Sequence, residues 1–137
     1  MHPPPAVDGN PSENSHPVAR APDTAAAARR QVTELLRAAG VSADSVAAAD
    51  ALLVTSELVT NAIRHGGGVT AFHATLDGDT LRLAITDARP QRPVPRSTGH
   101  GHPGGFGWPL VRRLTEHVDI TPLPDGGKTI TTVQRLV

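Results

Sequence analysis

The sequence has 137 residues, a length that fits one domain with a single hydrophobic core. Its 13 basic and 13 acidic residues cancel to a net charge of 0, which argues against a nucleic-acid or anionic-membrane surface. There is no cysteine, which excludes disulfides and thiolate metal sites and fits a reducing cytoplasm. Since no apolar run approaches the ~18 residues of a membrane span and no signal-peptide core is present, we expect a soluble, cytoplasmic protein.

The chain begins with a segment that has almost no apolar periodicity. Residues 1–21 are rich in Pro, Ser, Asn and His, so we expect a disordered tail followed by one folded domain over residues 22–137. Asp23 or Thr24 can cap a first helix, which runs through a stretch of alanines to about Ala39.

A second predicted helix begins at Asp44 or Ser45 and carries polar groups that packing alone does not require. At about 100° per residue, Glu57, Asn61 and Arg64 line one side of it, and most of its remaining circumference is apolar. Its apolar side gathers Leu52, Thr55, Val59, Ala62 and Ile63. A carboxamide oxygen is a hard ligand for a divalent cation, and a carboxylate one turn away can accept a proton or orient a water. The alternative is a solvated helix face, because polar pairs with this spacing are common.

Two strand-like runs follow at residues 69–76 and 81–87, joined by a hairpin signal, Asp-Gly-Asp. In the second run apolar and polar residues alternate, and by this parity Asp87 points inward at the end of the strand. A buried carboxylate needs a partner because an unpaired one is costly. The alternative is a strand-end aspartate that hydrogen-bonds the following turn.

Residues 88–103 show no regular pattern and contain four prolines and three arginines. Loops of this length inside a compact domain are usually functional lids or disorder. His100 and His102 lie in this loop, but two histidines without a third ligand nearby are a weak signal for a metal.

The glycine-rich sequence Gly-Gly-Phe-Gly at residues 104–107 opens a third predicted helix. The N–H groups and the dipole of a helix start suit an anion, although many helices begin after glycine without binding one. Two final strands, 118–123 and 128–137, form a hairpin across a Pro-Asp-Gly-Gly turn.

The sequence ELVTNAIRHG, from Glu57 to Gly66, resembles the asparagine box of the GHKL ATPases and kinases. More narrowly, it resembles the small ATP-binding anti-sigma-factor serine kinases of bacterial partner-switching systems. Later motifs extend this resemblance in the same order. Asp87 takes the place of an aspartate that accepts a hydrogen bond from the adenine amine, and Gly105 and Gly107 take the two glycine positions of the second glycine box. Thr129 stands where the relatives place a threonine beside that aspartate, although threonine favours strands in any case.

The resemblance covers residues 23–137 and implies an α/β (α+β) two-layer sandwich. Three helices would pack on one face of a mixed, mostly antiparallel sheet, as in the histidine-kinase-like ATPase fold. ATP would lie between the second helix, the lid and the third helix.

The resemblance also implies a role for each matched residue. Glu57 would act as the general base, and Asn61 would coordinate Mg²⁺. Asp87 and Thr129 would select adenine, and the amides around Gly105 and Gly107 would hold the phosphates. The partners implied are a sigma factor and an anti-sigma-factor antagonist, with no direct nucleic-acid or membrane contact. The near relatives pair through their sheets, which leaves a homodimer open.

Two departures from the family pattern support alternative functions. The segment after Asp87 lacks both glycines of the first glycine box, and Phe106 and Trp108 replace the arginine and leucine common in near relatives. An exposed Phe and Trp would weaken phosphate contacts or form a partner surface. One alternative is therefore an interaction module that acts by sequestration and catalyses nothing. A second is an ATPase or sensor-kinase catalytic domain, although the chain contains no phospho-acceptor histidine helix.

Overall fold

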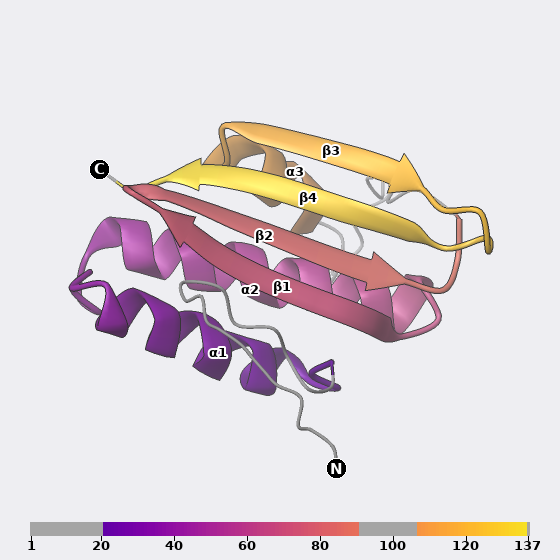
Figure 1. Ribbon diagram of the computed structural model, residues 1–137, viewed down its shortest axis with the longest axis horizontal. Coiled ribbons are helices and arrows are strands. Elements are labelled where there is room, and N and C mark those ends of the chain that lie inside the picture. Colours follow the sequence, from indigo (N-terminus) through magenta and orange to yellow (C-terminus); the bar gives the residue numbers. More distant parts are fainter. Residues whose placement is uncertain (1–20, 91–106, 137) are drawn as a thin grey trace, which may run out of the picture.

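The computed structural model describes residues 21–90 and 107–136. Within these ranges the chain forms three helices and four strands (Figure 1). They are α1 (Ala25–Ala38), α2 (Val46–His65), β1 (Val69–Asp77), β2 (Thr80–Asp87), α3 (Gly107–Leu114), β3 (His117–Pro122) and β4 (Lys128–Arg135). Most of the predicted tail, the loop from residue 91 onward, His100, His102, Gly105 and Phe106 lie outside the described residues.

The first two helices begin where the sequence offers capping side chains. The Thr24 hydroxyl accepts a hydrogen bond from the Ala27 N–H at 3.0 Å, and the Ser45 hydroxyl accepts one from the Ala48 N–H at 3.1 Å. Each cap satisfies one of the N–H groups that a helix start leaves unpaired. α2 ends at Gly66, whose N–H still donates to the Ala62 carbonyl.

The described part of the sheet has the strand order β1-β2-β4-β3, and each pairing is antiparallel. The expected mixed sheet is therefore antiparallel throughout these strands. β2 and β4 are the two central strands, and their register places Thr86 opposite Thr129 and Asp87 opposite Lys128.

The helices lie together against one face of the sheet, which confirms the predicted two-layer α+β arrangement (Figure 1). α2 occupies the middle of the helical layer, where it contacts α1, α3 and the sheet. The core is mainly aliphatic, and the inward residues of β2 alternate with outward ones along its length. By length and composition α2, with 20 residues, could cross a membrane, since an 18-residue window of it has a mean hydropathy of 1.4. Its packing inside the domain accounts for that apolar character.

Two side chains differ from the predicted burial. Ile63, expected on the apolar side of α2, has 44% of its surface exposed. Trp108, expected to be exposed, has only 7% exposed and belongs to the hydrophobic core beside Val111. Trp108 lies in the first turn of α3, which packs on α2, so burying the indole removes a large apolar area from water. A partner surface that includes Trp108 is therefore not present.

Candidate functional site

The polar face of α2 contains two side-chain atoms that are buried and have no hydrogen-bond partner within the described residues. They are Glu57 Oε1 and Asn61 Nδ2, which lie one helical turn apart. Buried polar atoms in native proteins are nearly always paired, so an acceptor and a donor left open together indicate a place for a polar ligand or water. One further atom of this kind is described, Gln134 Oε1, at the opposite end of β4 from Lys128.

The environment of Glu57 changes its acidity. Burial raises the pKa of the Glu57 carboxyl, and the positive charge of Arg64, about two turns along the same helix, partly opposes this rise. Desolvation disfavours the charged form, so the carboxylate becomes a better proton acceptor. This direction suits a general base, which works best when its pKa lies near the operating pH.

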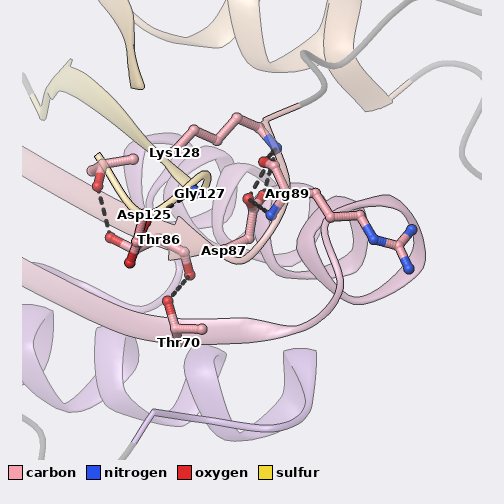
Figure 2. A network of polar contacts seen from close by, with 8 residues as sticks. Thr70, Thr86, Asp87, Arg89, Asp125, Gly127 and Lys128 are labelled. Carbon is pink, nitrogen blue, oxygen red and sulfur yellow. Dashed lines mark hydrogen bonds and ion pairs between the residues drawn. The ribbon is translucent and has the colours of Figure 1, made fainter. Parts of the chain in front are cut away.

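Asp87 lies at the other side of the site, in a buried ion pair that Figure 2 shows. The Lys128 ammonium lies 3.0 Å from Asp87 Oδ1 and 2.8 Å from Oδ2, and its third hydrogen bond, of 2.9 Å, goes to the Arg89 carbonyl. The Arg89 N–H donates to Asp87 Oδ1 at 3.2 Å. Only 5% of Asp87 and 3% of Lys128 are exposed, so the two charges neutralise each other out of contact with water.

Two glycines allow the polypeptide to close around Asp87. A Cβ at Gly66 would overlap the Asp87 carboxylate, and a Cβ at Gly127 would overlap the Asp87 backbone carbonyl. Both glycines are buried. Any side chain at either position would therefore push Asp87 out of its place between α2 and β4.

Gly66 also connects the two halves of the site. It is the C-cap of α2, and its carbonyl accepts a hydrogen bond of 2.9 Å from the Ala88 N–H, directly after Asp87. Asn61 lies five residues earlier, about 7.5 Å along the helix axis at 1.5 Å per residue. The fold thus brings the end of the polar face of α2 to the Asp87 carboxylate.

The described side-chain contact of Thr129 is with Thr86, the residue before Asp87. The hydroxyls of Thr86 and Thr129 lie 2.8 Å apart, and both side chains point to the face of the sheet away from the helices. Because successive residues of a strand point to opposite faces, Lys128 is the β4 residue that reaches Asp87. The role of Asp87 and Thr129 in selecting adenine stays a prediction.

The remaining predicted residues are only partly described. Gly107 is the first residue of α3, as its motif predicted, and Gly105 lies outside the described ranges. In residues 21–90 and 107–136, no group of three or more His, Asp or Glu residues could hold a metal ion. A cation at Asn61 would therefore need most of its ligands from a bound phosphate and water, which is the usual arrangement for Mg²⁺ with a nucleotide.

Sequence reasoning missed Lys128, Gly66 and Gly127 as parts of the site. Strand alternation could have found Lys128, since it has the parity of Ile130 and of the other inward residues of β4. The role of the glycines depends on a contact between segments distant in sequence, and no local pattern reveals that contact.

Comparison with known proteins identifies the family. The profile of the family described as "Histidine kinase-like ATPase domain" matches residues 18–134. The fold is similar to the histidine kinase domain of the blue-light activated histidine kinase from Erythrobacter litoralis EL346, with a TM-score of 0.48 and 19% identity. That match covers 93% of this chain and 70% of the other. A second structure of the kinase from the same organism gives a TM-score of 0.47 and 21% identity, over 86% of this chain and 47% of that one. No curated protein sequence matches the chain at the significance required.

The profile match covers most of the chain, including α2, Asp87 and Lys128. Open polar atoms on α2 and a buried carboxylate beside the end of that helix are compatible with a nucleotide and its cation. The chain belongs to the histidine kinase-like ATPase domain family, whose domains bind ATP, typically with Mg²⁺.

Proposed function

We propose that the chain is an anti-sigma factor with serine kinase activity, which transfers the γ-phosphoryl group of ATP to a serine of an anti-sigma-factor antagonist. The catalytic part of this proposal rests on two unpartnered atoms of α2, Glu57 Oε1 and Asn61 Nδ2. The C-terminal end of this helix, at Gly66, lies next to Asp87 and is hydrogen-bonded to Ala88. The family supports ATP binding. The serine acceptor and the sigma factor are proposed from the resemblance of the α2 sequence to the anti-sigma kinases.

The side chains divide the work according to their chemistry. The Glu57 carboxylate accepts the proton of the attacking serine hydroxyl, and its raised pKa favours that transfer. The Asn61 carboxamide offers an oxygen to Mg²⁺ and a donor to a phosphate oxygen. When bound, Mg²⁺ supplies neutralisation of the phosphate charge. Asp87 accepts the adenine amine, and the amides at the start of α3, near Gly107, face the phosphates.

The cellular setting follows from the same proposal. ATP, sigma factors and their antagonists are cytoplasmic, so we place the protein there, with no membrane or direct nucleic-acid contact. A homodimer formed through the sheet remains part of the proposal.

A second candidate is a module that sequesters its partner and catalyses nothing. The segment after Asp87 favours it, because Arg89 and Gln91 stand where the first glycine box, Asp-x-Gly-x-Gly, has its two glycines. The burial of Trp108 removes it from the grounds for this candidate, since its side chain belongs to the core, and leaves the missing glycines and Phe106.

The deciding experiment combines calorimetry with a radiolabel assay. The wild-type chain is titrated with Mg-ADP, and then incubated with Mg-ATP labelled at the γ-phosphate and a panel of purified anti-sigma-factor antagonists. We expect heat of binding and label transferred to an antagonist serine. Asn61→Ala should abolish transfer, because the cation loses its protein ligand, while the circular dichroism spectrum stays that of the wild type.

Ser56→Ala is the matched control. Ser56 lies on the same helix and accepts a hydrogen bond of 3.1 Å from Arg29, on the flank that faces α1. This variant should keep full transfer activity. Wild-type transfer by Asn61→Ala would contradict the role of Asn61. Binding without any transfer would favour the sequestering module, and label on the chain itself would favour a sensor-kinase or ATPase domain.

A further inference from the structure

We propose that Lys128 closes the adenine end of the site: its ammonium occupies the Asp87 carboxylate, and a nucleotide reaches that carboxylate only after the Lys128 side chain has moved aside. Lys128 would then act as an internal competitor that lowers nucleotide affinity. This inference rests on the proposed ATP binding, which assigns the adenine amine to Asp87. It adds to that proposal a contact within the chain that the nucleotide must displace.

Contacts from three parts of the chain surround the Asp87 carboxylate. The Lys128 ammonium lies 3.0 Å from Oδ1 and 2.8 Å from Oδ2, and the Arg89 N–H donates to Oδ1 at 3.2 Å. The end of α2 packs against Oδ2 so closely that a Cβ at Gly66 would overlap it. Only 5% of Asp87 is exposed. An incoming amine must therefore take the place of one of these contacts.

The contact made by Lys128 is the one most easily released. The Arg89 N–H and Gly66 belong to the backbone, and the N–H and the carbonyl of Gly66 are themselves hydrogen-bonded to neighbouring residues. Lys128 instead reaches Asp87 through a flexible four-carbon side chain. Its own backbone is paired with a strand on each side. The side chain can therefore turn away while β4 stays in the sheet.

The exchange preserves the hydrogen bonding of Asp87 but not that of Lys128. The Lys128 ammonium and the adenine amine are both N–H donors, so Asp87 stays paired when one replaces the other. Lys128 gives up its three described hydrogen bonds, two to Asp87 and one to the Arg89 carbonyl. The nucleotide must offset that loss. A contact that is closed in about nine of ten molecules lowers the apparent affinity about 10-fold.

The first test compares affinities for Mg-ADP by calorimetry. The wild-type chain is titrated beside Lys128→Met and the control Gln134→Met. Gln134 lies on the same inward face of β4 and is also buried, but it bonds the Ala47 carbonyl at the start of α2. Lys128→Met should bind about 10-fold or more tightly than the wild type, and Gln134→Met should keep the wild-type affinity. Unchanged or weaker binding by Lys128→Met overturns the inference.

A second ligand separates release of Asp87 from a general opening of the site. The diphosphate of purine riboside has hydrogen in place of the adenine amine, so it has no donor to offer Asp87 there. Lys128→Met should leave the affinity for its Mg complex close to that of the wild type. Equal tightening of this ligand and of ADP would show that Lys128 does not compete with the amine, which overturns the inference.

A measurement on the wild type decides the matter even if Lys128→Met does not fold. Lys128 is the only lysine in the sequence, so a chain grown with isotope-labelled lysine reports on this one side chain by NMR. Saturation with Mg-ADP should shift the ammonium resonance or broaden it through exchange with water. Heat of binding with an unaltered resonance overturns the inference alone. Absence of heat in the wild type and in any folded Lys128→Met overturns the proposed ATP binding, and the inference with it.

Discussion

The two halves of the site differ in how completely their polar groups are paired. The ammonium of Lys128 makes three hydrogen bonds, and both oxygens of Asp87 are engaged. On α2, by contrast, Glu57 Oε1 and Asn61 Nδ2 are buried and have no partner among the described residues. The Asp87–Lys128 half is paired like the interior of a stable protein. The α2 half lowers the stability of the fold, because buried polar atoms there lack hydrogen bonds.

The contrast separates polar groups that already pair with one another inside the protein from buried polar atoms that pair with nothing described. A saturated buried network stabilises one arrangement and penalises the loss of any member. Open buried polar atoms lower the stability of the fold, and a ligand that pairs them supplies binding energy. Substitutions at Lys128 or Gly66 should therefore reduce stability, and substitutions at Glu57 or Asn61 should affect binding and catalysis at little cost in stability.

The largest expected effect on stability comes from removing one member of the buried ion pair. Lys128→Met should lower the free energy of unfolding by about 3–5 kcal/mol, because it leaves the Asp87 charge buried without its partner. Urea unfolding monitored by circular dichroism measures this loss. Asp87→Asn/Lys128→Met should recover part of it, since no charge remains buried. A single variant as stable as the wild type would show that the pair is not the stabilising half of the site.

Gly66→Ala should have a smaller but substantial effect. Its φ of −103° is one that alanine adopts easily, so any loss comes from the overlap of the new Cβ with the Asp87 carboxylate. We expect a loss of about 1–3 kcal/mol, the usual range for overpacking a core. Gly40→Ala is the control, because alanine there is strained by the backbone angle and not by an overlap. The φ of Gly40 is +83°, and no atom lies within 4 Å of the new Cβ. Gly40→Ala should therefore lose stability without changing nucleotide affinity, whereas Gly66→Ala should weaken both.

The smallest effect on stability is expected at Glu57, where it depends on pH. Burial raises the folded-state pKa of Glu57 above its ordinary value of 4.5, so the folded chain binds a proton more tightly than the unfolded chain does. The stability that this carboxyl contributes is fully present below its unfolded pKa and is lost as pH rises through the folded pKa. Glu57→Gln should remove this decline, so its stability relative to the wild type should increase between about pH 4.5 and neutrality. Unfolding curves across that range test the sign, and a relative decrease would mean that the carboxylate is stabilised in the folded state.

Local patterns predicted the fold well. Capping residues, hydrophobic periodicity and turn signals located all seven described elements, because each signal lies within a few residues of the element that it starts or ends. Ile63 was the main error on α2: a helix that is apolar around most of its circumference does not reveal which of its sides meets solvent. Trp108 was predicted to be exposed but is buried, because the comparison with a motif gave no information on how α3 packs.

The site was predicted less completely than the fold. Glu57 and Asn61 share one helix, so their spacing alone brings them together. The parity of β2 correctly turned Asp87 inward, but its ion-pair partner Lys128 was not predicted, although the parity of β4 turns Lys128 inward. The overlap that would follow a side chain at Gly66 or Gly127 depends on the tertiary approach of three segments, and only coordinates supply it.

The strand order has a consequence for motion. β2 and β4, which provide Asp87 and Lys128, each have a neighbouring strand on both sides, whereas β1 and β3 lie at the edges. Fraying at either edge can leave the central pair of strands hydrogen-bonded to each other. Backbone amides around Thr86 and Ile130 should therefore exchange with solvent deuterium only when the domain opens as a whole, so the proposed base-reading group would keep its geometry through the smaller fluctuations of the sheet.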